Sequence, residues 1–277
     1  MRTQISAGDQ GEPKIDEKEM SFLDHLEDLR WHIVRSSVAI VFFAVFAYVF
    51  SDFIFEHVIF AHKKDTFLTY KIFCQIGVCM TPPNFTIIQT ELGEQFFVAL
   101  KVSFWIGFIS SFPYIFTQFW KFIKPGLYKE EQKAARGVVF ICSFLFLTGV
   151  AFGYFVMAPF AIKFLGDFNV GQNISVANGT SLSSYVSYLT MFVLPTGFLF
   201  QLPVLIHFLA KVGLVTDESM KKYRKHAFVS ILVLAAIITP PDIITQFLIG
   251  VPVYFLYEIS ILIAKRAAEK REAELKS

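Results

Sequence analysis

Two short segments place carboxylates beside aromatic and basic side chains. Residues 21–30 contribute Glu27 and Asp28, and residues 122–131 contribute Glu131. The planar guanidinium of arginine matches a carboxylate with two parallel hydrogen bonds, and partial burial at a membrane surface strengthens such charge-assisted bonds. Both segments are therefore candidate sites for a cationic group. The alternative for each acid is an ordinary solvated charge.

One amide lies inside a long apolar segment. Gln201 is ten residues before Lys211, or about 15 Å along a helix, which places it near the middle of a bilayer. Its default role is hydrogen bonding between helices, and the alternative is a functional intramembrane site. Pro195 and Pro203 flank it, and together with Pro159 they predict bent helices that form a concave surface.

The sequence contains no phosphate-binding loop, no zinc-protease motif and no serine-hydrolase motif. We therefore expect no enzymatic activity, cofactor or metal. The three cysteines form no CxxC pair, so no metal site follows from them. Cys74 and Cys79 are either a short disulfide in an external loop or two free thiols. The net charge of +2 is too small to indicate a nucleic-acid partner.

The composition indicates that the candidate residues Glu27, Asp28, Glu131 and Gln201 are positioned by membrane helices. Hydrophobic residues make up 55% of the 277 positions and charged residues only 17%, with a mean hydropathy of +0.54, so the chain is expected in a membrane. Four apolar segments approach or reach the roughly 20 residues that a membrane helix needs. They are residues 33–50, 96–119, 138–164 and 185–210. The pattern of residues 21–30 predicts an amphipathic helix at the membrane interface, directly before the apolar segment 33–50.

A tight hairpin of two helices is predicted after residue 226. Pro240, Pro241 and Asp242 interrupt the apolar stretch there, because proline cannot continue a helix. The fifth helix, 227–238, rises only about 18 Å, less than the roughly 30 Å of a hydrocarbon core. We expect local thinning of the bilayer; the alternative is a re-entrant pair that does not cross.

Lysine and arginine predict the orientation. They are concentrated at 121–136, at 211–225 and after residue 264, and are absent from 166–184 and from the Pro240–Asp242 turn. Positive loops face the cytoplasm, which predicts an all-α integral membrane protein with six transmembrane helices and both termini inside. The expected organisation is a disordered tail at 1–20, a membrane domain at 21–266 and a cytoplasmic tail at 267–277.

An ordered series of motifs resembles the TatC family, the multispanning receptor component of the twin-arginine protein translocase. The resemblance covers about residues 21–266. The motifs are His25-Leu-Glu-Asp-Leu-Arg30, Pro113 with Gln118 and Trp120, residues 122–131, residues 151–155 with Pro159, Phe200-Gln-Leu-Pro203, Thr239-Pro-Pro-Asp242 and Tyr257-Glu-Ile259.

The resemblance implies a cup-shaped six-helix bundle in the bacterial cytoplasmic (inner) membrane, with short fifth and sixth helices. It implies a receptor for the twin-arginine signal peptides of folded cargo, transport driven by the proton-motive force, self-association, and single-span partners of the TatA type and possibly the TatB type. The signal-peptide site implied by the motifs comprises Glu27, Asp28, Arg30, Phe122, Pro125 and Glu131. Gln201 and Pro203 would contact a partner within the membrane, and Pro240, Pro241 and Asp242 would form a periplasmic cap.

The chain departs from the family pattern at two positions. Asp28 stands where the family has glutamate and is one methylene shorter, so its contact could be shared with Glu27. Gln201 stands where the family has an acid, and it keeps hydrogen bonding but cannot ionise near neutral pH. The alternative function is a secondary transporter or channel for a small solute, which should show inverted repeats around a midplane site. An intramembrane enzyme, which would need a nucleophile and base or clustered metal ligands, is the third alternative.

Overall fold

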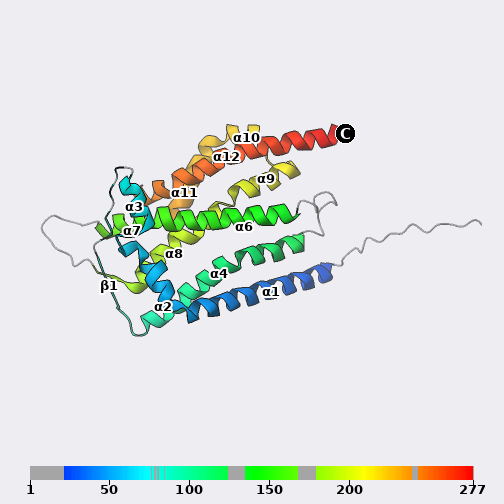
Figure 1. The fold of residues 1–277 in the computed structure, drawn as a ribbon. Helices are drawn as coiled ribbons and strands as arrows, with labels where there is room; N and C mark the ends of the chain where they lie inside the picture. The colour runs from blue at the N-terminus through cyan, green and yellow to red at the C-terminus, as the bar shows by residue number, and fades with distance from the viewer. Residues whose placement is uncertain are drawn as a thin grey trace, which may run out of the picture.

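A computed structural model describes residues 22–75, 77, 79, 81–83, 85–123, 135–167, 179–238 and 243–276. Within these residues, five helices are long and apolar enough to cross a membrane. They are His25–Val49, Glu94–Ile123, Gly137–Asp167, Leu182–Val212 and Gln246–Glu269. The helices run alongside one another as an elongated bundle (Figure 1), so the predicted all-α membrane fold is confirmed.

The first two spans form a closely packed pair at one side of the bundle. Helix α1 (Phe22–Val49) is continuous over 28 residues, so the segment expected as an interfacial helix is the first part of the same helix that forms the span. It lies along α4 (Glu94–Ile123). The backbones approach closely at Gly107, where an added Cβ would lie 2.6 Å from the backbone nitrogen of Ala44. The absence of a side chain at Gly107 is thus what lets α1 and α4 meet.

The third span contains a bulge produced by proline. It consists of α6 (Ala135–Phe152), the π-helical turn η4 (Gly153–Met157) and α7 (Ala158–Asp167). Pro159 has no backbone N–H, so the carbonyls of Tyr154 and Phe155 cannot receive its hydrogen bond.

Side chains from the segment after α1 satisfy those two carbonyls. His62 Nε2 donates to Tyr154 O over 3.0 Å, and Thr69 Oγ1 donates to Phe155 O. His62 is fully buried, and burial lowers its pKa below the usual histidine value. The neutral ring is therefore the form that fits this site. The bulge thus provides the attachment point for the segment between the first two spans.

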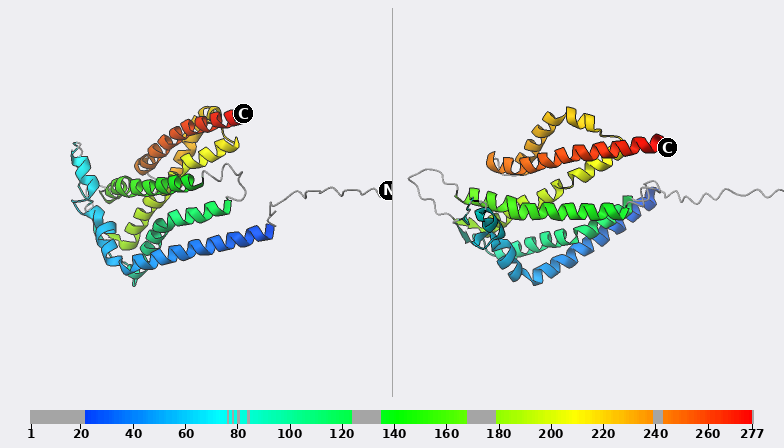
Figure 2. Two further views of the ribbon diagram at one scale, coloured as in Figure 1. Left: turned by 45° about the vertical axis from the view of Figure 1, so that its right-hand side comes forward. Right: turned by 45° about the horizontal axis from the view of Figure 1, so that its top comes forward.

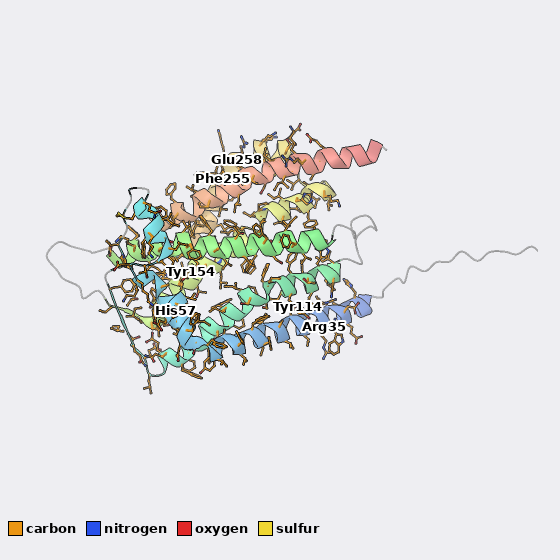
Figure 3. All side chains as sticks on the ribbon, viewed as in Figure 1. Arg35, His57, Tyr114, Tyr154, Phe255 and Glu258 are labelled. Atoms are coloured by element: carbon orange, nitrogen blue, oxygen red, sulfur yellow. A yellow bond between two sulfur atoms is a disulfide. The ribbon has the colours of Figure 1, made fainter. Side chains whose placement is uncertain are left out.

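That segment covers one end of the bundle (Figure 1). Its helical elements are α2 (Ser51–Ile54), η1 (Phe55–Ile59), η2 (Phe60–Lys63) and α3 (Leu68–Gln75). The hydroxyl of Tyr154 donates to Val58 O over 2.7 Å, and that of Tyr185 donates to Ile59 O over 2.8 Å. Figure 3 shows Tyr154 reaching toward the part of this segment that carries His57.

The remainder of the same segment is held by a disulfide and a small sheet. Cys74 and Cys79 are joined as a disulfide, which decides between the two alternatives left by the sequence. Strand β1 (Thr86–Ile88) pairs in parallel with β2 (Gly179–Ser181). The buried carboxylate of Glu94 accepts hydrogen bonds from the backbone N–H of Ser183 at 2.6 Å and of Thr90 at 2.8 Å. These contacts connect the start of α4 to the start of α8.

The fourth span is broken near its middle, as the flanking prolines predict. Helix α8 (Leu182–Leu199) ends before Phe200 and Gln201, and α9 (Leu202–Val212) begins after them. Helix α9 ends at Gly213, whose φ of +86° places it in the left-handed region that glycine adopts readily.

The last helices lie at the side of the bundle opposite α1 (Figure 2). Helix α10 (Asp217–Lys222) is followed by α11 (Arg224–Ile238), which has 15 residues and begins three residues earlier than predicted. Its rise of about 22 Å is still less than a hydrocarbon core. Helix α11 is joined to the next helix by an ion pair of 2.7 Å between Arg224 Nη2 and Glu258 Oε2.

The expectation of a short sixth helix was wrong. Helix α12 (Ile243–Lys276) is continuous over 34 residues. Its last three turns are rich in alanine, glutamate, lysine and arginine, which are strong helix formers. Lys265 and Glu269 add an i,i+4 pair at 3.8 Å. The predicted turn of Pro240, Pro241 and Asp242 lies outside the described residues, so the predicted cap stays a prediction.

Candidate functional site

The start of α1 and the end of α4 lie together at the end of the bundle away from the disulfide (Figure 1). The ring of His25 stacks on the ring of Phe122 with centroids 4.3 Å apart. One helical heptad later, His32 Nδ1 is 2.8 Å from Gln118 Oε1. Two side chains of α1 therefore contact two side chains of α4. We call His25, His32, Gln118 and Phe122 the helix-end cluster.

Helical geometry places Asp28 beside this cluster. Asp28 is three residues after His25 and four before His32, so it shares their face of α1. Its side chain is exposed. The face of α1 that meets Phe122 through His25 therefore also carries an exposed carboxylate, which is the combination of groups that the sequence predicts for a cationic ligand.

Glu27 and Arg30 are also exposed but point elsewhere. Glu27 is two residues from His25, or about 200° around the helix, and Arg30 is about 140° around it. Helical geometry thus separates Glu27 from Asp28 by about 100° around α1, and the sharing of a contact between them stays a prediction. The predicted role of Glu27 in the signal-peptide site stays a prediction.

Pro125 and Glu131 lie outside the described residues, in the connection 124–134 between α4 and α6. Their predicted roles stay predictions. The two ends of this connection are Ile123 and Ala135, and both lie at the same end of the bundle as the start of α1 (Figure 1).

Sequence reasoning did not assign His25, His32, Gln118 or Trp120 to the site. The seven-residue spacing of the two histidines is a signal that could have been used, because it places them on one helix face. Trp120 is buried and packs on Phe208 of α9, with ring centroids 5.3 Å apart. The end of α4 is thus fixed from both sides, by α1 and by α9.

Gln201 serves as a bond between helices. Its Nε2 donates to the backbone carbonyl of Cys142 in α6 over 3.0 Å, and the side chain is half-buried. Pro203 is buried in the first turn of α9. This contact confirms the prediction that the Gln201 amide forms a hydrogen bond between two helices. No contact within the described part of the chain tests the other prediction, that Gln201 binds a partner subunit, and it stays a prediction.

We expect Gln201→Leu to destabilise the protein by about 0.6 to 2 kcal/mol, the range for one interhelical hydrogen bond in a membrane. Gln201→Glu should recover most of this loss, because a protonated carboxyl can donate to the same carbonyl. Thermal unfolding of the two purified variants in detergent measures both effects. Equal stability of Gln201→Leu and the unchanged protein would show that the Cys142 contact contributes nothing.

Comparison with known proteins identifies the family. The profile described as "Sec-independent protein translocase protein (TatC)" matches residues 24–252. A protein of that name from Blattabacterium is 37% identical and covers 93% of this chain and all of its own length. One from Helicobacter pylori is 50% identical over 65% of this chain and 71% of its own length.

A solved structure agrees with this assignment. The crystal structure described as "Twin Arginine Translocase Receptor- TatC" superposes with a TM-score of 0.70 at 32% identity, and covers 88% of this chain and 99% of its own. The sequence match extends from the start of α1 into α12. The chain belongs to the TatC family of Sec-independent protein translocase proteins.

Proposed function

We propose that this protein is the receptor for twin-arginine signal peptides in the Sec-independent translocase, with its binding site at the helix-end cluster. The observation that carries the proposal is the placement of Asp28 on the face of α1 whose neighbours, His25 and His32, contact Phe122 and Gln118 of α4. An acid and an aromatic ring from two different spans are thereby presented together.

This arrangement suits a pair of arginines. One guanidinium can pair with Asp28 through two parallel hydrogen bonds and lie over the ring of Phe122, since arginine combines both interactions in one planar group. The second would pair with Glu131 from the connection between α4 and α6. Lysine offers a point charge without the fork or the flat surface, so paired lysines should bind less well.

The remaining assignments are part of the same proposal. The protein would lie in the bacterial cytoplasmic membrane with both termini in the cytoplasm, because the basic residues gather at the end that carries the helix-end cluster. Helix α11 would be the fifth of six crossings and would cross a locally thinned bilayer. TatA-type and possibly TatB-type single-span subunits would be its partners, the proton-motive force would drive transport, and no catalytic step is assigned to the chain itself.

The alternative of a solute transporter requires polar groups free to bind at the membrane midplane. Gln201 is the polar residue that the sequence places there, and its amide donates to α6. No contact among the described residues favours that alternative.

Photo-crosslinking tests the proposal. A photoreactive residue at Leu29 lies on the face of the helix-end cluster, because Leu29 is four residues after His25 and three before His32. One at Val34, which is 43% exposed, lies about 180° from His25 around the helix. A peptide with paired arginines should crosslink at position 29 and much less at position 34. A matched peptide with paired lysines should crosslink weakly at both. Equal crosslinking of the two peptides at position 29 would contradict the assignment.

A further inference from the structure

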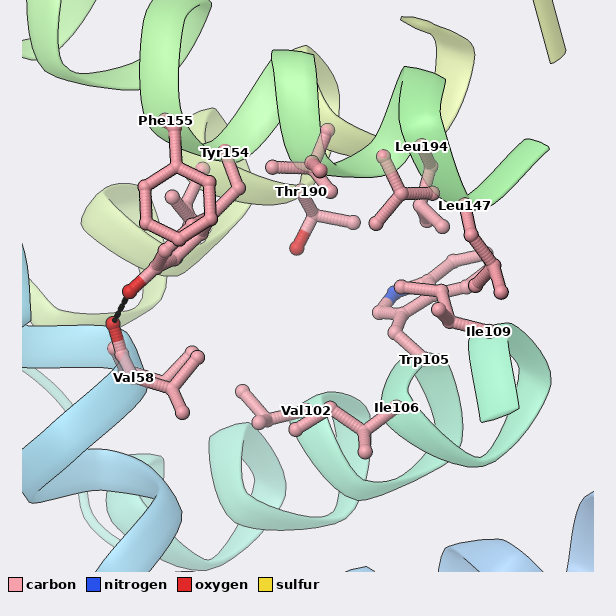
Figure 4. A pocket seen from close by; sticks show the side chains of 15 residues that line it. Val58, Val102, Trp105, Ile106, Ile109, Leu147, Tyr154, Phe155, Thr190 and Leu194 are labelled. Carbon is pink, nitrogen blue, oxygen red and sulfur yellow. Dashed lines mark hydrogen bonds between the residues drawn. The ribbon is translucent and has the colours of Figure 1, made fainter. Parts of the chain in front are cut away.

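An apolar pocket of about 330 Å³ lies between α4, α6 and α8, beside η1 (Figure 4). Val102, Trp105, Ile106 and Ile109 line it from α4, at the i, i+3, i+4, i+7 spacing of one helix face. The pocket is partly open. It is well separated along α4 from the helix-end cluster, since Ile109 precedes Gln118 by nine residues, or about 13 Å.

The two hydroxyls in the pocket wall already have partners within the protein. Thr190 Oγ1 donates to Val186 O over 2.8 Å, and the Tyr154 hydroxyl donates to Val58 O over 2.7 Å, as the dashed line in Figure 4 shows. The wall therefore presents hydrocarbon apart from the indole N–H of Trp105. A polar solute would lose its hydration here in exchange for that single donor, so the occupant must itself be mainly apolar.

A fixed positive charge lies one helical turn from the pocket. Lys101 is four residues before Trp105, and its Nζ donates to Ser187 Oγ over 2.9 Å. Ser187 is in turn three residues before Thr190. Lys101 on α4 and Ser187 on α8 thus lie one helical turn from the pocket, both toward the end of the bundle where these two helices begin. The ammonium has three donors, and the bond to Ser187 uses only one of them.

The depth of Lys101 fits a lipid headgroup. Helix α4 has 30 residues and is about 45 Å long, similar to the full thickness of a bilayer with its headgroups. Lys101 is seven residues from the start of α4, or about 10 Å, near the boundary between headgroups and hydrocarbon. The pocket lies immediately deeper, at the level of acyl chains.

We propose that this pocket and Lys101 together bind one anionic phospholipid. An acyl chain would occupy the apolar pocket between α4 and α8, and the phosphate would pair with the ammonium of Lys101. The lipid would be drawn from the leaflet at the end where α4 and α8 begin. It would fill the space between these helices that no side chain of the described residues fills. The proposal is independent of signal-peptide binding.

The test uses the full-length protein, purified and stripped of lipid in detergent. Phosphatidylglycerol and phosphatidylcholine with identical acyl chains are added, and bound lipid is quantified by native mass spectrometry. The unchanged protein should bind one phosphatidylglycerol in preference to phosphatidylcholine. Lys101→Gln keeps a hydrogen-bonding group and loses the charge, and should weaken phosphatidylglycerol binding about fivefold, as expected for one lysine at an anionic surface. Lys71→Gln, an exposed lysine of α3 away from the pocket, is the matched control and should bind like the unchanged protein.

A second variant tests the pocket itself. Thr190→Trp places a large ring in the pocket and should abolish retention of the lipid, with thermal unfolding in lipid-free detergent showing that the variant is folded. Equal binding of the two lipids by the unchanged protein, or no effect of Lys101→Gln, would overturn the role of Lys101. Unchanged lipid retention in Thr190→Trp would also overturn the proposal. If the same variant lost crosslinks to a partner's apolar helix, that helix would be the occupant.

Discussion

Export of a twin-arginine cargo should be abolished by Asp28→Lys and, separately, by Glu131→Lys, while the protein still inserts into the membrane at a normal level. Each change replaces a bidentate acceptor of arginine with a repelling cation, and we expect a loss of about 2 kcal/mol or more in signal-peptide binding, roughly thirtyfold in affinity. Cargo reaching the periplasm measures export, and immunoblotting of membranes measures insertion.

The structure supplies a control that the sequence does not. Glu27→Lys makes the same charge change one residue from Asp28, but on the opposite side of α1 from the helix-end cluster. It should leave export close to normal. If Glu27→Lys and Asp28→Lys impaired export equally, net charge at the start of α1 would matter rather than a specific contact. Normal export by Glu131→Lys would remove the connection 124–134 from the arginine site.

Gly107→Leu is expected to separate α1 from α4 and to abolish export, although Gly107 is not part of the helix-end cluster. A Cβ at this position would lie 2.6 Å from Ala44 N and 2.8 Å from Ile40 O. Both are backbone atoms, which cannot rotate away as a flexible side chain can. Overpacking of this kind costs about 1 to 3 kcal/mol. Because α1 packs mainly against α4, the whole helix must shift, and the contact between His25 and Phe122 should be lost with it.

Two measurements separate this effect from general misfolding. Thermal unfolding in detergent reports the stability, and disulfide formation between cysteines placed at His25 and Phe122 reports the helix-end contact. Gly137→Leu is the matched control, since nothing lies within 4 Å of a Cβ at that position of α6. It should retain both stability and the engineered disulfide. Efficient disulfide formation in Gly107→Leu would show that α1 and α4 adapt without separating.

Local sequence features were sufficient to predict much of the fold. Membrane helices depend on the length of an apolar run, so four spans were identifiable without knowledge of any neighbour. Proline acts through its own backbone, and the break before Pro203 and the bulge before Pro159 both follow from it. The length of α12 was missed because the expectation rested on the resemblance rather than on the helix-forming residues after Ala264.

Contacts between distant segments were decided only by the tertiary structure. Sequence placed Glu27 and Asp28 in one acidic segment, but only the contact of His25 with Phe122 shows which face of α1 meets the end of α4. Helical geometry then puts Asp28 on that face and Glu27 on the opposite one. Likewise, the carbonyls freed by Pro159 are predictable, whereas their partners His62 and Thr69 are not. The physical reason is the same in both cases. Hydropathy and backbone chemistry are properties of a short stretch of chain, whereas the side chains that meet depend on how closely two helices approach and how they are rotated.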